Sequence, residues 1–235
     1  METKIEGLKI NYEVRRSEEA SRPRIDHKLG DFTVVIPEGA SYEPEELLLR
    51  KRNWVSKKKR EFLRFKRKIP ERNLEEDGKI SILGDEKRIK VESRRSNQID
   101  EDVLLAKHLV ERTSLRDQLE KVLRAKARKV IEKKISHYSG QISQDYDKIF
   151  IRDQQTKWGS CSTKGNLNFN WRLVLGPEKV LEYVVVHELV HLEIKSHNEN
   201  FWKRVRELYP EYKEANKWLS ENSSKLVFNK SMLSN

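Results

Sequence analysis

The sequence contains a single cysteine, Cys161, and no uninterrupted run of about 18 apolar residues. One cysteine excludes a disulfide bond within the chain, and without an apolar run no membrane-spanning helix is expected. The first residues are polar and lack the basic and then apolar arrangement of a secretory signal. We therefore expect a cytoplasmic protein with no membrane partner. No internal repeat or low-complexity segment is evident.

The 235 residues are 36% hydrophobic and 37% charged, with a net charge of +11. The segment from Arg50 to Lys68 holds eleven Lys or Arg and one acid, so most of the net charge lies there. Such a run is an electrostatic footprint for polyanions, and it is equally typical of a solvated helix face. Under the first interpretation, nucleic acid would contact Lys57, Lys58, Lys59 and Arg60.

The N-terminal half reads as β-rich with one basic helix. Alternating apolar residues predict strands over 8–14 and 32–36, and a helical stripe predicts a helix over 43–68, ended by Pro70. Two further runs, 79–83 and 88–91, are typical of a hairpin. Because residues 93–102 are polar and lack apolar periodicity, we place a domain boundary there. The expected domains are residues 1–100 and 101–235.

The C-terminal half alternates helices with extended segments. Ser114 and Asp117 begin a long amphipathic helix that Gly140 ends. Extended chain is expected over 149–152, 156–162 and 167–175, and a helix from Pro177 to about Lys195. Two short helices, 201–208 and 211–219, follow. The expected fold class is α+β, with a smaller N-terminal β-rich domain.

The stretch from His187 to His197 carries the clearest chemistry. His187, Glu188 and His191 form an H-E-x-x-H motif, which on a helix places two imidazoles on one face, one turn apart. A single zinc ion can bridge that separation, and Glu188 would lie beside it as a general base. The helix is apolar nearly all round, so the histidines are also compatible with hydrogen-bonded core residues.

The third metal ligand is less defined by spacing. His197 follows His191 after enough chain to leave the helix and fold back, and Glu193 and Glu199 compete for the same role. Three protein ligands would leave the fourth tetrahedral position open, which is the mark of a catalytic zinc site.

A second candidate segment, Thr156–Ser162, contains Lys157, Trp158, Gly159 and Ser160, the candidate substrate-binding residues. If this segment is an exposed strand beside the metal helix, an extended substrate can add to it as another strand. Gly159 is where another backbone can approach closely. Trp158 and Cys161 are equally compatible with core positions. Arg172, on a polar strand face, is a candidate to stabilise charge on a substrate oxygen, or a surface residue.

Several of these elements occur together in one order: Thr156-Lys157-Trp158-Gly159-Ser160-Cys161, Asn170-Trp171-Arg172-Leu173-Val174, Tyr183 to His191, His197 and Phe201-Trp202. In this the chain resembles the YgjP-like metal-dependent hydrolases, relatives of the SprT and zincin metallopeptidases. The resemblance is strong over residues 149–218 and weaker in the N-terminal half. It implies a zincin-like fold, zinc held by His187, His191 and His197, and Glu188 as the catalytic acid and base.

We therefore expect a zinc-dependent hydrolase with one zinc per chain, acting on peptides or proteins. Two alternatives stay open. In the first, the basic segment and Arg172 serve a phosphoanhydride, which makes the enzyme a nucleotide hydrolase. In the second, the chain is a nucleic-acid-binding module whose structural zinc takes Cys161 as its fourth ligand, and Glu188 then has no chemical role. Imidazole ligands also suit other transition metals.

Overall fold

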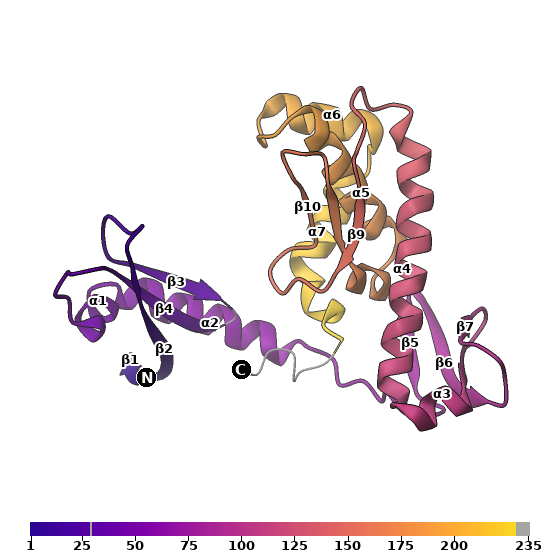
Figure 1. Cartoon of the computed structure of the whole chain (residues 1–235), viewed down its shortest axis with the longest axis horizontal. Coiled ribbons are helices and arrows are strands. Elements are labelled where there is room, and N and C mark those ends of the chain that lie inside the picture. Colours follow the sequence, from indigo (N-terminus) through magenta and orange to yellow (C-terminus); the bar gives the residue numbers. More distant parts are fainter. Residues whose placement is uncertain (29, 229–235) are drawn as a thin grey trace. The chain divides into compact units, whose positions relative to one another are not determined.

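A computed structural model describes residues 1–28 and 30–228. These residues form two compact units, and the chain passes from the first to the second between Ile69 and Pro70 (Figure 1). The sequence predicts the boundary near residue 100. The structure differs because Ile89, Val103 and Leu105 are fully buried in the core of the second unit. The polar segment 93–102 therefore lies between strands of one sheet, and Gln98–Ile99 within it pairs in that sheet. No helix in the described ranges is both long and apolar enough to cross a membrane.

The N-terminal unit is a four-stranded sheet with two helices. Its strands lie in the order β1-β2-β4-β3, where β2 and β4 are parallel and the other neighbours antiparallel. The bounds are β1 Glu2–Ile5, β2 Leu8–Ser17, β3 Arg24–Lys28 and β4 Asp31–Pro37. The two strands expected here are present, whereas β1 and β3 were not anticipated. Phe32, Val34 and Ile36 of β4 are buried in the core of this unit.

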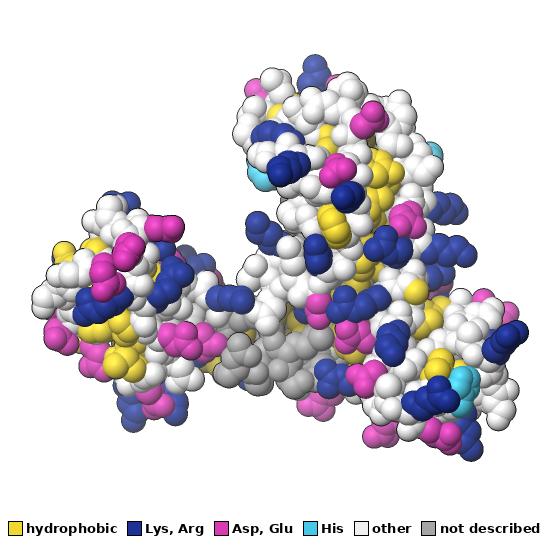
Figure 2. Space-filling model, in the orientation of Figure 1, with side chains coloured by type: hydrophobic (Ala, Val, Ile, Leu, Met, Phe, Trp, Pro, Cys, Tyr) yellow, Lys and Arg dark blue, Asp and Glu magenta, His cyan; other side chains and the backbone are white. Residues whose placement is uncertain are grey.

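The expected basic helix is divided into α1 (Pro44–Arg50) and α2 (Arg52–Arg67). Leu48 of α1 and Val55 of α2 are fully buried against the sheet. Within the basic run, Lys58 pairs with Glu61, Lys59 donates to the carbonyl of Gly30, and Arg60 pairs with Glu6. On the face shown in Figure 2, basic side chains of this unit are interleaved with acidic ones. Binding of nucleic acid by this run stays a prediction.

The second unit begins with a four-stranded sheet in the order β5-β6-β8-β7. The strands are β5 Lys79–Ile82, β6 Asp85–Glu92, β7 Gln98–Ile99 and β8 Val103–Ala106, followed by the short helix α3, Lys107–Arg112. The structure has the expected hairpin as β5 and β6, paired from Lys79↔Arg88 to Ile82↔Asp85. At its tip, the backbone N–H of Leu83 donates to Val174 and the carbonyl of Leu83 accepts from Glu178.

Helix α4 (Leu115–Ser139) begins and ends where the sequence predicts, and the Ser114 side chain caps it by accepting from the Asp117 N–H. A three-stranded sheet follows in the order β10-β11-β9, with β9 Ile149–Arg152, β10 Gly159–Cys161 and β11 Leu167–Asn170. The strand expected over 167–175 was too long. After Asn170 the chain turns into the 3₁₀ helix η1, Trp171–Leu175, because the Asn170 side chain accepts from the Arg172 N–H.

Three helices complete the unit: α5 Glu178–Glu193, α6 Glu199–Leu208 and α7 Tyr212–Asn222, with the 3₁₀ helix η2, Ser223–Leu226. Helix α4 lies along α5, and both contribute to one core with the two sheets (Figure 1). The mixed α and β architecture agrees with the expected class.

Candidate metal centre

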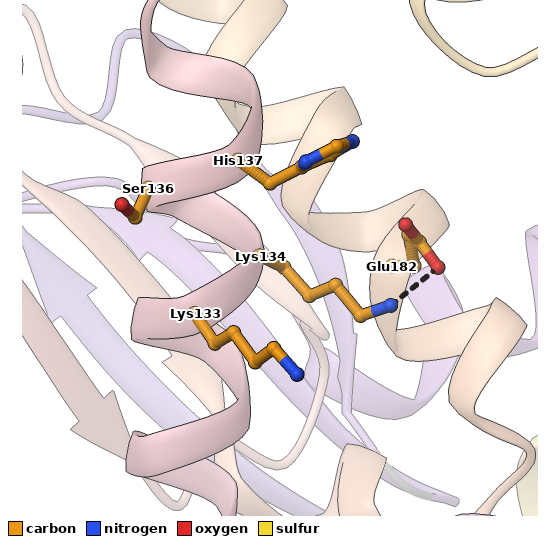
Figure 3. A pocket seen from close by; sticks show the side chains of 5 residues that line it. All are labelled: Lys133, Lys134, Ser136, His137 and Glu182. Atoms are coloured by element: carbon orange, nitrogen blue, oxygen red, sulfur yellow. Dashed lines mark hydrogen bonds and ion pairs between the residues drawn. The ribbon is translucent and has the colours of Figure 1, made fainter.

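Helix α5 carries the H-E-x-x-H motif through the middle of the core. Ten of its sixteen residues are buried, from Val180 to Leu192, as the apolar pattern predicts. Lys134 of α4 pairs with Glu178 and Glu182 of α5, and the Tyr138 hydroxyl donates to Glu182. Figure 3 shows Lys134 reaching from α4 to Glu182. These contacts on the flank of α5 fix the rotation of the helix, and with it the direction of its histidines.

The three histidines of the stretch converge on one point. The Nε2 atom of His197 lies 3.0 Å from the Nε2 of His187 and 3.1 Å from the Nε2 of His191. For tetrahedral zinc with Zn–N bonds of about 2.0–2.1 Å, ligand nitrogens are about 3.3 Å apart. The observed separations are close to that value. This set of imidazole nitrogens therefore fits a divalent metal ion, and it includes His197 rather than Glu193 or Glu199.

Neighbouring groups fix the tautomer of His191 and keep His187 uncharged. The Nδ1 atom of His191 lies 3.0 Å from the carbonyl of Ile194, which assigns the proton to Nδ1 and leaves the lone pair on Nε2. Burial lowers the pKa of His187 to about 3, so this imidazole is uncharged at neutral pH. The ring of Phe201 lies 4.6–4.9 Å from all three imidazoles. Phe201 lies in the first turn of α6, and its N–H donates to the side chain of the cap residue Asn198, which directly follows His197.

Glu188 lies on the same helix and is only 5% exposed. Burial raises the pKa of its carboxyl group to about 8, although Lys157 and the N–H of Cys161 act in the opposite direction. Its Oε2 atom has no hydrogen-bond partner within residues 1–28 and 30–228. An unpaired buried carboxyl oxygen is costly and is expected where a ligand or substrate completes the site.

Gly159 lies directly against Glu188. A Cβ atom built on Gly159 would come within 2.5 Å of the Oε1 atom of Glu188 and 2.6 Å of its Cγ. The sequence predicts that another backbone approaches at Gly159, whereas the close neighbour in the structure is the side chain of Glu188. Strand β10 starts at this glycine and forms one edge of its sheet, pairing with β11 from Gly159↔Phe169 to Cys161↔Leu167. Lys157 and Trp158 precede the strand, and Ser160 lies within it.

Arg172 is placed differently from the sequence expectation. Its side chain is buried, with the residue 4% exposed, and the guanidinium donates to the carbonyl of Gln154 at 2.5 Å and to the Asn170 Oδ1 at 3.1 Å. It also pairs with Asp153 and lies over the Trp158 ring, 5.7 Å from its centroid. Arg172 is therefore neither a surface residue nor free to point into solvent. Its contacts hold the segment that leads into β10.

Asn170 was not singled out by sequence reasoning as a site residue. Its side-chain amide donates to the carbonyls of Gln154 and Lys157, and its N–H donates to the carbonyl of Trp158. Asn170 is completely buried in the structure, whereas in the sequence it alternates with apolar residues as if on an exposed polar strand face, so the sequence contains no signal for its role.

The remaining candidates have other partners. The Sγ atom of Cys161 lies 3.9 Å from Lys195 Nζ and is not part of the histidine cluster. Glu193 accepts from the N–H of Ser143 and from Arg204. Lys57 to Arg60 lie on α2 in the other unit.

Residues 22–222 match the model of a YgjP-like metallopeptidase domain, which is most of the chain. The chain belongs to the YgjP-like family. This confirms the resemblance seen in the sequence, and it identifies the histidine cluster as lying in a metallopeptidase domain.

Two solved structures of metallopeptidase zymogens are also similar to this YgjP-like protein. Jannalysin of Methanocaldococcus jannaschii is 24% identical, with a TM-score of 0.34, covering 41% of this chain and 96% of that one. Abylysin of Pyrococcus abyssi is 22% identical, with a TM-score of 0.34, covering 43% of this chain and 99% of that one. No curated protein matches the sequence. The family assignment supports a metal-dependent hydrolase of peptides.

Proposed function

We propose that this protein is a zinc-dependent peptidase with a zincin-like catalytic unit, which holds one zinc ion on His187, His191 and His197. The convergence of three Nε2 atoms at 3.0–3.1 Å carries the proposal. Zinc bound there supplies a Lewis acid that polarises a peptide carbonyl and lowers the pKa of water. Three protein ligands leave the fourth coordination position of zinc open. The contact between Cys161 Sγ and Lys195 Nζ supports this, because Cys161 then has another partner and is not the fourth ligand.

Glu188 is the proposed general base and acid. Its carboxylate accepts a proton from the attacking water and passes it to the amine of the leaving group. Two features of the chain suit this role. The Oε2 atom has no hydrogen-bond partner among the described residues and so can accept the proton, and burial of Glu188 keeps bulk water from taking that proton.

The proposed substrate site is the free edge of β10. An extended peptide added to this edge would pair with the backbone of Gly159 and Ser160, next to Glu188. Lys157 and Trp158 would contact the same peptide at the start of the strand. Arg172 acts here as a positioning residue, because its hydrogen bonds fix the segment before β10.

The test is an activity screen of zinc-loaded protein against peptides, nucleotides and nucleic acids. We expect cleavage of peptides, and a loss of about 10² to 10⁴ in rate for Glu188→Gln with its zinc retained. Glu199→Gln makes the same chemical change on an exposed residue of α6 and should keep full activity. Cleavage of nucleotides alone, or unchanged turnover in Glu188→Gln, would refute the proposal.

A further inference from the structure

The N-terminal unit contains a groove of about 480 Å³ between strand β3 and helices α1 and α2. Apolar side chains line its floor and basic side chains its rim. The residues that matter for its chemistry are Ile25, Leu47 and Trp54 on the floor and Arg22, Arg24 and Lys51 on the rim.

The floor offers a fixed aromatic surface. Trp54 is 38% exposed, which is unusual for tryptophan, yet its ring packs edge-on against Phe32 at 6.1 Å and His27 at 6.3 Å. A ring held by buried neighbours loses little conformational entropy when an apolar group covers it. Trp54 is therefore prepared to receive an apolar or aromatic side chain.

The rim selects a negative charge. The residues that line this groove include Arg22, Arg24 and Lys51 and no acid. Arg24 pairs with Asp26, which lies outside the lining, at 3.2 Å, but both side chains are 47% exposed. An exposed pair of this kind is weak and exchanges readily for another carboxylate.

The edge of β3 selects a peptide backbone. In the order β1-β2-β4-β3, strand β3 pairs with β4 from Arg24↔Val35 to Lys28↔Asp31, and within the described residues its other edge has no strand. An unpaired edge presents alternating N–H and C=O groups that match another extended chain. Nucleic acid offers no such pattern. Side chains of an added strand that face the helices would enter the groove beside Ile25.

We propose that this groove binds an extended, acidic segment of another protein as an additional strand on β3. Its outward-facing carboxylates would contact Arg24, whose side chain lies with Asp26 on the exposed face of β3. Carboxylates at its ends would contact Arg22 and Lys51, and one inward-facing apolar or aromatic side chain would cover Trp54. The proposal concerns binding by the N-terminal unit and is independent of the chemistry at the histidine cluster.

The experiment uses the full-length chain with Glu188→Gln, so that a bound peptide stays intact. The probe is a labelled peptide of about six residues, the usual length of a strand, in which Glu alternates with Val and Tyr. Fluorescence anisotropy should show binding, and hydrogen exchange should slow at the amides of β3. A peptide with Lys in place of Glu should not bind. An acidic peptide with Pro at alternate positions should lose binding because it lacks the required N–H groups.

Two variants test the groove itself. Arg22→Ser with Lys51→Ser should weaken binding about tenfold by removing two rim charges. Trp54→Ala should weaken it by a similar factor. The matched control is Lys57→Ser with Arg67→Ser, which removes the same charge from exposed positions of α2 outside the lining and should leave affinity unchanged.

Equal loss of affinity in the control, equal binding of the Lys peptide, or no protection at the amides of β3 would overturn the proposal. Displacement of the peptide by a single-stranded oligonucleotide that binds more tightly would also overturn it, in favour of a polyanion site. Thermal unfolding of each variant separates loss of the groove from loss of the fold.

Discussion

The contact between Gly159 and Glu188 gives the sharpest prediction for the active site. The substitution Gly159→Ala places a methyl group 2.5 Å from Oε1, 2.6 Å from Cγ and 2.8 Å from Cδ of Glu188. Real Cβ atoms do not approach other heavy atoms so closely, and Glu188 is only 5% exposed, so it has little room to retreat. Overpacking of this kind costs about 1–3 kcal/mol in the free energy of unfolding.

The effect on activity should exceed the effect on stability. Because Glu188 must move by about 1 Å to relieve the contact, its carboxylate leaves the geometry for proton transfer. A displacement of that size costs about 10² in rate. The three atoms nearest to the new methyl group all belong to Glu188 and none to a histidine, so the zinc content should stay the same.

The assay compares kcat/KM, zinc content and thermal unfolding of Gly159→Ala with those of the parent. Gly140→Ala is the matched control, since Gly140 has a helical φ of −64° and nothing lies within 4 Å of an added Cβ. If Gly159 acts through Glu188, then Gly159→Ala should change little further in a Glu188→Gln background. Full activity of Gly159→Ala would refute the proposed coupling. So would a loss of kcat/KM that is as large in the Glu188→Gln background as in the parent.

Three further predictions concern residues around the cluster. Cys161→Ala should leave zinc content unchanged, and loss of zinc in elemental analysis would instead favour a closed structural site. Arg172→Met should lower the free energy of unfolding by about 1–3 kcal/mol, because the carbonyl of Gln154 and the Asn170 Oδ1 each lose one of their two donors. Arg172→Lys should raise KM more than it lowers kcat, and the reverse split would contradict a positioning role. His191→Ala should abolish zinc binding and remove the thermal stabilisation that added zinc gives the parent, as scanning calorimetry can measure.

The metal helix could be predicted from sequence because its signals are local. The spacing of His187 and His191 and the apolar pattern of the helix each depend on residues within a few turns of one another. The cap of α4 at Ser114 and the hairpin of β5 and β6 are local in the same sense. The structure has all of them where the sequence predicts.

Features that depend on distant contacts were missed or misplaced. Strand β8, which follows the polar segment 93–102, pairs with β6, which precedes it, and β7 within that segment pairs with β8. These pairings keep residues 70–106 in the second unit. The alternation from Leu167 to Leu173 fits a strand, but the Asn170 side chain turns the chain after four residues. The neighbour of Gly159 also depends on the pairing of β10 with β11.

The most direct test of the proposed centre is X-ray absorption spectroscopy at the zinc edge of protein loaded with one equivalent of zinc. The account predicts one zinc environment with three imidazole nitrogens at about 2.0–2.1 Å, a fourth oxygen neighbour and no sulfur. A sulfur neighbour at about 2.3 Å, or a His197→Ala variant that gives an unchanged spectrum, would contradict it.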